Sequence, residues 1–189
     1  MSGARPFLLA AVAALSLSAS GYASAQMSGE HTVMVGGAAM YPSKNIIENA
    51  VNSKDHTTLV AAVKAASLVD TLSGPGPFTV FAPTNEAFAK LPAGTVDTLV
   101  KPENKDTLVK ILTYHVVAGR MTAMDIKAAI KAGGGNATLT TVEGEPLIAT
   151  MSGGKLHLTD AKGGTSTVTI ADVMQSNGVI HVVDTVLMP

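Results

Sequence analysis

The sequence predicts an α+β fold, and three observations lead to that prediction. Apolar residues recur at helical spacing through the first two thirds of the chain. From Ala137 onward, short β-rich runs alternate with glycine-containing turns. Between them, residues 79–88 (TVFAPTNEAF) join a short strand directly to a helix. Because helices come first and hairpins second, this segregation favours α+β over a parallel α/β sheet.

The N-terminal part of the chain has the pattern of an export signal, which we assign to residues 1–25. An apolar run over residues 7–17 follows a positive residue, and small residues at 23–25 form a cleavage site. Residues 26–39 are small and polar without a sustained period, so they predict a flexible N-terminal lead. A single domain is expected over residues 40–189.

Two helices are expected before the first strand of the domain. Apolar residues within 42–51 indicate a short helix, and Asp55 is expected to cap a second one. The apolar positions of residues 59–66 form a stripe at helical spacing, which predicts a face turned toward the core. The Gly-Pro-Gly-Pro run at 74–77 stops this helical part before the strand.

The junction TVFAPTNEAF is predicted from the properties of its own residues. Thr79 and Phe81 favour an extended chain, and Pro83 keeps the residue before it out of the helical region. Thr84 is a suitable N-cap for the helix that follows. Phe88 is expected to turn back from that helix toward the strand.

Four further elements are expected between the junction and the hairpins. Residues 93–100 and 102–112 predict helices, the second beginning at a proline. Residues 113–117 (TYHVV) are β-rich and predict a strand. Thr122 and Asp125 have the spacing of a capping box, so a third helix is expected to begin there.

The last third of the chain is predicted to consist of strands and tight turns. Glycine pairs and the dipeptide Asn177-Gly178 stand where antiparallel hairpins reverse direction. The β-rich runs are residues 138–142, 146–151, 155–159, 165–170 and 179–186.

The composition of the chain excludes some classes of protein. The chain carries 13 Lys and Arg against 14 Asp and Glu, and its lysines are scattered singly, so a nucleic-acid binder is excluded. After the N-terminal run, no apolar segment of about 20 residues follows, so no membrane span is expected. Cysteine is absent, so the core forms without disulfides. We expect a monomer.

Three motifs in order resemble those of fasciclin-like domains. TVFAPTNEAF resembles the first signature box of that family, and NGVIHVVDTVLMP at 177–189 resembles the second. Tyr114-His115 stands where the family carries its tyrosine-histidine motif. The resemblance covers residues 40–189 and implies a helical layer packed on a wedge of short, mainly antiparallel strands, with the closing strand near the opening one. The fold-signature residues are Thr79, Phe81, Pro83, Thr84, Asn85, Phe88, Asn177, Gly178, His181 and Asp184.

Tyr114 and His115 are the candidate functional residues, and two interpretations stay open. The apolar neighbours favour a structural role, in which the imidazole donates to a backbone carbonyl. The resemblance implies the other, a contact surface, because this region is linked to receptor contact in animal members. His181 lies on a strand with apolar residues on both faces, so a core position is expected.

No catalytic or cofactor-binding motif is present in the sequence. We find no G-x-S-x-G, H-E-x-x-H or phosphate-binding glycine loop, and no cysteine nucleophile. We therefore expect neither an enzyme nor a metal or cofactor.

The resemblance implies an exported adhesion module, in the periplasm or outside the cell. Its expected partner is a cell-surface or matrix protein or a polysaccharide. The alternative is a carrier of an apolar small molecule such as a carotenoid, which some fasciclin-like proteins bind. Few aromatic residues are available to line such a site.

Overall fold

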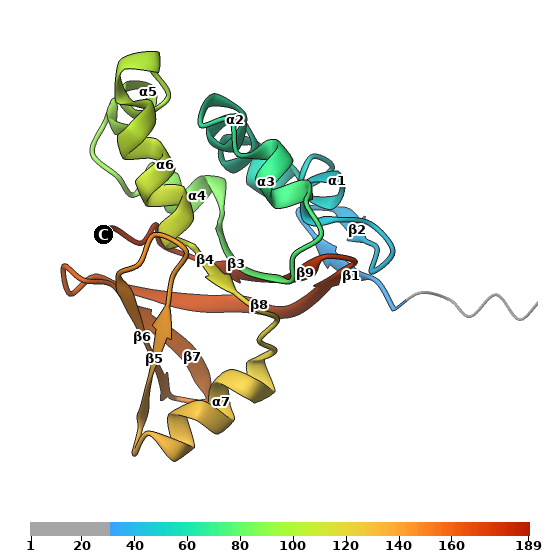
Figure 1. Cartoon of the computed structure of the whole chain (residues 1–189), viewed down its shortest axis with the longest axis vertical. Coiled ribbons are helices and arrows are strands. Elements are labelled where there is room, and N and C mark those ends of the chain that lie inside the picture. The colour runs from blue at the N-terminus through green and yellow to red at the C-terminus, as the bar shows by residue number, and fades with distance from the viewer. Residues whose placement is uncertain (1–30) are drawn as a thin grey trace, which may run out of the picture.

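The computed structural model describes residues 31–189, in which a layer of helices covers one side of a seven-stranded sheet and a single helix covers the other (Figure 1). The expected signal peptide, residues 1–25, lies outside the described residues. The helices are α1 Ile46–Ala50, α2 Thr57–Ala65, α3 Val69–Ser73, α4 Asn85–Ala89, α5 Thr95–Leu99, α6 Lys105–Tyr114 and α7 Ala123–Ala132, with 3₁₀ turns at Lys54–His56 and Pro102–Asn104. The strands are β1 Val33–Val35, β2 Ala38–Met40, β3 Phe78–Pro83, β4 Val116–Ala118, β5 Asn136–Thr140, β6 Pro146–Ser152, β7 Lys155–Thr159, β8 Thr165–Gln175 and β9 Gly178–Val183.

The sheet has the strand order β4-β3-β9-β8-β7-β6-β5, and it confirms the predicted α+β class. Its pairs are antiparallel except for β3 and β9, which run parallel with Phe78 opposite Gly178. The closing strand therefore lies beside the opening one, as the resemblance implied. The two edges of the sheet also meet, because Val117 of β4 bridges to Thr141, the residue that follows β5. The sheet thus curls back on itself.

Strand β8 holds the two parts of the sheet together. Its first residues, up to Thr167, pair with β7, and the remainder from Val168 pairs with β9. Two register shifts interrupt the second pairing, and Asp172 has a φ of 57°. Such bulges bend a strand and increase its twist. The strand therefore continues to Gln175, past the end predicted at residue 170.

Alternating residues of the central strands β3 and β9 pack into two different hydrophobic cores. In β3, Val80 and Ala82 face the helix-layer core, which lies between the sheet and α1, α2, α4 and α6. Phe81 faces the opposite way, into the α7 core formed by α7 and strands β5 to β8. In β9, Ile180 belongs to the first core and Val183 to the second. A strand with both faces buried is hydrophobic throughout, as these two are.

The junction between β3 and α4 forms as predicted. Thr84 is the N-cap, and its hydroxyl accepts a 3.2 Å hydrogen bond from the Ala87 N–H. Phe88 is buried in the helix-layer core, together with Val80 and Ala82 of the strand. The second predicted cap is also present, because Thr122 forms a capping box with Asp125 at the start of α7.

The strand predicted at residues 113–117 is wrong in its first half. Helix α6 continues to Tyr114, His115 is its C-cap, and β4 begins only at Val116. The hydroxyl of Thr113 donates to the Val109 carbonyl at 2.7 Å, so a β-rich residue is accommodated in the helix. Tertiary packing of the Tyr114 ring overrides the local β propensity.

The expected flexible lead is wrong for residues 33–39. Strands β1 and β2 form an antiparallel hairpin around Gly36-Gly37, both at positive φ. Val35 and Met40 are buried in the helix-layer core. Small residues suggested a loop, but the apolar side chains of Val35 and Met40, one from each strand, pack the hairpin on the core.

Candidate functional site

Tyr114 and His115 lie at the point where α6 ends and β4 begins. Leu108, Ile111 and Leu112 fix the orientation of α6, since they form its buried face. The two motif side chains point into different parts of the protein. Tyr114 belongs to the α7 core, and His115 contacts a cavity in the helix layer.

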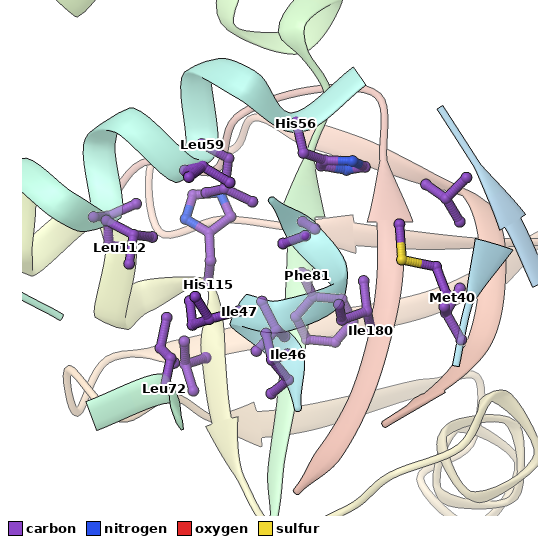
Figure 2. Close-up of a pocket in the computed structure, with 18 residues that line it drawn as sticks. Met40, Ile46, Ile47, His56, Leu59, Leu72, Phe81, Leu112, His115 and Ile180 are labelled. Carbon is purple, nitrogen blue, oxygen red and sulfur yellow. The ribbon is translucent and has the colours of Figure 1, made fainter. Parts of the chain in front are cut away.

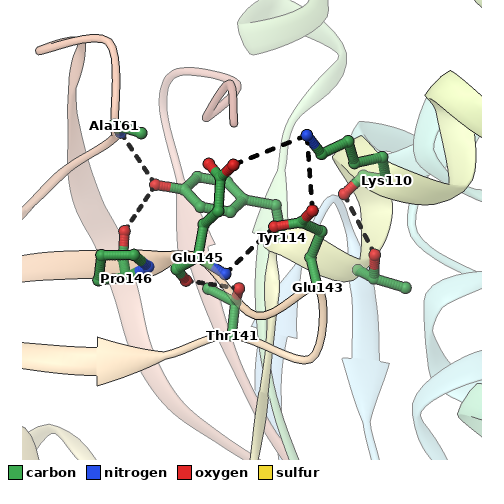
Figure 3. Close-up of polar contacts among 8 residues, drawn as sticks. Lys110, Tyr114, Thr141, Glu143, Glu145, Pro146 and Ala161 are labelled. Carbon is green, nitrogen blue, oxygen red and sulfur yellow. Dashed lines mark hydrogen bonds and ion pairs between the residues drawn. The ribbon is translucent and has the colours of Figure 1, made fainter.

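The Tyr114 side chain is fully buried and its hydroxyl is fully bonded (Figure 3). It donates to the Pro146 carbonyl at 3.0 Å and accepts from the Ala161 N–H at 3.0 Å. Burial raises the pKa of this phenol, and the carboxylates of Asp160, Glu145 and Glu143 act in the same direction. The residue therefore ties α6 to the start of β6 and to the turn before β8.

An ion-pair cluster lies close to Tyr114 at the surface (Figure 3). Lys110 Nζ is 3.6 Å from Glu143 and 3.7 Å from Glu145. The Lys110 side chain is 49% exposed, so solvent screens both pairs. The two ion pairs therefore add little to stability, in contrast to the buried hydroxyl of Tyr114.

His115 is buried, and both of its ring nitrogens are bonded to backbone. Nδ1 lies 2.8 Å from the Ile111 carbonyl, and Nε2 accepts a 2.9 Å hydrogen bond from the Leu187 N–H. This pairing fixes the neutral tautomer with its proton on Nδ1. Burial lowers the pKa of His115 to about 4. The imidazole thus links the end of α6 to the C-terminal segment.

His181 lies in the centre of β9, and both of its ring nitrogens are also bonded to backbone, with the roles of Nδ1 and Nε2 reversed relative to His115. Nε2 is 2.8 Å from the Met121 carbonyl, and Nδ1 accepts from the Asp172 N–H at 3.2 Å. The ring stacks on Phe81, with 5.6 Å between centroids. Burial lowers the pKa of His181 as well. Its bond to Asp172 holds the bulge in β8 in place.

The two signature asparagines join segments that are distant in sequence. Asn177 accepts from the Ile46 N–H at 3.1 Å and donates to the Leu72 and Gly74 carbonyls at 2.7 and 2.8 Å. Asn85 accepts from the Thr58 N–H at 3.0 Å and donates to a carbonyl of the preceding 3₁₀ turn. Each amide therefore satisfies backbone groups at the ends of short helices.

The remaining signature residues also contact backbone. The Thr79 hydroxyl donates to the Gly119 carbonyl at 2.7 Å and accepts from the Met121 N–H at 2.8 Å. The Asp184 carboxylate accepts from the Thr167 N–H at 2.9 Å, and its pKa is lowered although burial opposes that shift. At Gly178, a Cβ atom would lie 2.1 Å from the Phe78 carbonyl oxygen. The parallel pairing of β3 with β9 requires glycine there.

No arrangement for catalysis or metal binding emerges from these contacts. The nitrogens of His115 and His181 are occupied by backbone groups, so neither ring faces a reactive side chain. Within residues 31–189, no group of three or more His, Cys, Asp or Glu is placed to hold a metal ion.

A third histidine, His56, is expected to be exposed, because the sequence places it in the first turn of a helix, and the structure shows that this expectation is wrong. Residues 54–56 form a 3₁₀ turn, so Asp55 does not cap α2 as expected. The turn directs His56 inward, where it is 2% exposed and lines an apolar cavity (Figure 2). The cavity volume is about 30 Å³, so it cannot enclose a carotenoid. No local pattern around His56 signals its burial.

A shallow groove on the opposite side of the protein was also missed. It lies between α7 and strands β7 and β8, and has a volume of about 330 Å³. Leu156, Val168 and Ala123 supply apolar walls, and the exposed Lys127 and Lys155 lie along it. The two lysines are 28 positions apart in sequence, so only the packing of α7 on the sheet brings them to one groove.

Comparison with known proteins assigns the chain to a family. Residues 54–189 match the family model of the fasciclin domain. The chain belongs to the fasciclin domain family. The fasciclin match begins after the β1–β2 hairpin and α1, which the structure packs onto the same core.

This fasciclin domain is similar to several bacterial proteins. It is 49% identical over 160 residues to Protein sll1483 of Synechocystis sp., covering 85% of the chain and 82% of that protein. It is 39% identical over 145 residues to the immunogenic protein MPB70 of Mycobacterium bovis, covering 74% of the chain and 66% of that protein. The cell surface glycolipoprotein MPB83 of Mycobacterium bovis is 35% identical over 193 residues, covering all of the chain and 80% of that protein.

A solved structure confirms the fold of the fasciclin domain. The FAS1 domain pair of the insect cell adhesion molecule fasciclin I superposes with a TM-score of 0.69 at 18% identity, over 85% of this chain and 58% of that one. At this identity, the match establishes the fold alone. In the part of the chain described by the structure, no helix is long and apolar enough to cross a membrane.

Proposed function

We propose that this protein is an exported, non-catalytic adhesion module that binds an anionic polysaccharide of a cell surface or matrix. Membership of the fasciclin domain family supports an adhesion-type extracellular module. The similarity to a cell surface glycolipoprotein supports a location in the periplasm or outside the cell.

The contact surface lies away from the tyrosine-histidine motif. Tyr114 is 0% exposed and His115 is 2% exposed, and the polar atoms of both side chains are paired with backbone. A partner that touched these side chains would first have to open the core. The motif instead supports the contact surface indirectly, by fixing the fold.

The groove between α7 and β7–β8 is the surface best suited to a partner, and it carries the proposal. Lys127 and Lys155 are both exposed on it, and neither makes an ion pair within residues 31–189. Its apolar walls offer contact to the faces of sugar rings, and its ammonium groups attract carboxylate or sulfate groups. The chain as a whole is slightly acidic, so this local positive charge is not a consequence of overall composition.

The test uses alginate, a polymer of uronic acids, with neutral dextran as the comparison. Binding of the exported protein is measured by calorimetry at low and high salt. We expect binding to alginate that weakens as salt screens the lysines, and no binding to dextran. The double variant Lys127→Glu/Lys155→Glu should lose alginate binding at least tenfold.

A matched control changes the same charge elsewhere. Lys64→Glu/Lys101→Glu alters two exposed lysines of the helix layer, far from the groove in the fold. We expect this variant to bind alginate within about twofold of the unmodified protein. Equal loss in both double variants, or equal binding to dextran, would contradict the assignment of the groove.

A further inference from the structure

One side of α7 carries a row of exposed side chains that continues beyond the groove between α7 and β7–β8. Met124, Lys127 and Lys131 are spaced i, i+3 and i+7, so they lie on the same side of the helix. Ile126 and Ile130 belong to the buried face of α7, which is turned toward the sheet. Lys127 lines the groove, so the row runs along the flank of α7 that borders it.

The side chains of this row are accessible to a partner. Met124 is 78% exposed, more than any other large apolar side chain within residues 31–189. A single exposed methionine is common on protein surfaces, but this one stands beside an apolar groove. Lys127 and Lys131 are also exposed, and neither forms an ion pair in the described part of the chain.

The acidic groups close to this flank lie at the N-terminal end of α7 and are engaged there. The Asp125 carboxylate accepts a 2.8 Å hydrogen bond from the Thr122 N–H, as part of the capping box. The Asp172 carboxylate accepts from the Ala123 N–H at 2.6 Å. The two lysines of the row lie further along the helix. A polyanion along this flank therefore meets a more positive surface toward the C-terminal end of α7.

The spacing of the two α7 lysines indicates how charge is distributed along the partner. Lys127 and Lys131 are four residues apart, so their backbones are separated by about 6 Å along the helix axis. This separation is similar to the length of one sugar unit in an extended polysaccharide. The two ammonium groups can therefore meet the carboxylates of neighbouring sugar units, while Lys155 approaches from the other wall of the groove.

We propose that the groove binds a polyuronate with a carboxylate on every sugar unit, which lies along α7 with neighbouring units at Lys127 and Lys131. This inference rests on the proposed function and deepens it by naming the charge spacing of the polysaccharide. Lys131 is a further specificity-determining residue, beyond those that line the groove. The ligand continues over Met124 at the other end of the row, where the apolar side chain contacts the face of a sugar ring.

Two oligosaccharides with equal charge and different spacing test this inference. Tetramannuronate carries four carboxylates on four units, whereas a hyaluronan octasaccharide spreads four carboxylates over eight units. Calorimetry with the full exported protein at low salt should show about fivefold tighter binding of tetramannuronate. Lys131→Gln should weaken tetramannuronate binding about fivefold, and should change binding of the octasaccharide by less than about twofold.

A matched control separates ligand binding from a role of Lys131 within its own helix. Lys131 lies in the last turn of α7, where a cation also complements the helix dipole. Lys64 is exposed in the last turn of α2 in the same way. Lys64→Gln should therefore leave tetramannuronate binding within about twofold of the unmodified protein.

A second pair of variants tests whether the ligand passes over Met124. Met124→Glu places a carboxylate in the row and should weaken tetramannuronate binding about fivefold by repulsion. Met34 is 59% exposed on the β1–β2 hairpin, so Met34→Glu adds the same charge elsewhere. It should change binding by less than about twofold.

The outcomes distinguish this inference from the proposed function. Equal affinity for the two oligosaccharides, or equal effects of Lys131→Gln and Lys64→Gln, would overturn the charge spacing and leave the groove as a polysaccharide site. Equal effects of Met124→Glu and Met34→Glu would overturn the path over Met124. If the unmodified protein bound no alginate, the proposed function would fail, and this inference would fail with it.

Discussion

The backbone N–H of Leu187 donates a 2.9 Å hydrogen bond to Nε2 of His115, 72 positions earlier in the chain. The other nitrogen of that ring bonds to the Ile111 carbonyl in α6. One neutral imidazole therefore joins a helix C-terminus to the last residues of the domain. The tyrosine-histidine motif is a structural clamp in this conformation, and its environment has measurable consequences.

Stability should fall as the pH drops from about 6.5 toward 4. The unfolded chain protonates His115 near 6.5, whereas the folded protein does so only near 4. Between these values the unfolded state binds more protons, so the free energy of unfolding decreases as the pH falls, by on the order of 3 kcal/mol for this group. The pKa values of His56 and His181 are lowered too, and act in the same direction.

Urea unfolding at pH 7.5, 6.5, 5.5 and 4.5 measures this effect. The variant His115→Gln should show a shallower decline over the same range, whatever its stability at pH 7.5. A His115 ring that titrated near 6.5 in the folded protein would show that the imidazole is not held in its neutral form.

Tyr114→Phe should destabilise the protein by about 1–3 kcal/mol. The change removes only a hydroxyl, and leaves the Pro146 carbonyl and the Ala161 N–H without their buried partner. Tyr41→Phe is the matched control, because Tyr41 is 39% exposed. Thermal unfolding of both variants provides the measurement. Equal unfolding temperatures of Tyr114→Phe and Tyr41→Phe would mean that the buried Tyr114 hydroxyl does not contribute to stability.

Gly178→Ala should be among the most damaging single-methyl changes in the chain. Its Cβ would lie 2.1 Å from the Phe78 carbonyl oxygen, so β3 and β9 would have to move apart, at a cost of roughly 3 kcal/mol. Gly154→Ala meets no atom within 4 Å but has a φ of 78°, so only backbone strain of about 1 kcal/mol is expected. Urea unfolding should rank the two variants in this order, and the reverse order would contradict the close approach of β3 to β9.

The β1–β2 hairpin should contribute to stability although the family match begins at residue 54. Val35 is 2% exposed, and Val35→Ala should cost about 2 kcal/mol through lost burial. Its neighbour Met34 is 59% exposed, so Met34→Ala should change stability by less than about 0.5 kcal/mol. Similar effects of both substitutions on urea unfolding would indicate that the hairpin does not pack on the core.

Local features of the fold could be predicted because the residues that cause them are close in sequence. The Thr84 cap bonds to a residue three positions later, as does the capping box of Thr122. The turn at Asn177-Gly178 and the period of the last strands depend equally on neighbouring residues. Where distant packing competed with local propensity, prediction failed, as it did for the residues of TYHVV that continue α6.

The α+β class, the resemblance to fasciclin-like domains and the motifs that carry it follow from residue type and spacing alone. The pairing of the Tyr114 hydroxyl and the His115 ring inside the protein follows instead from tertiary packing. The same packing turns His56 toward a cavity and brings Lys127 and Lys155 to one groove. Burial depends on which segments pack together, and here those segments lie tens of residues apart, beyond the reach of any local pattern.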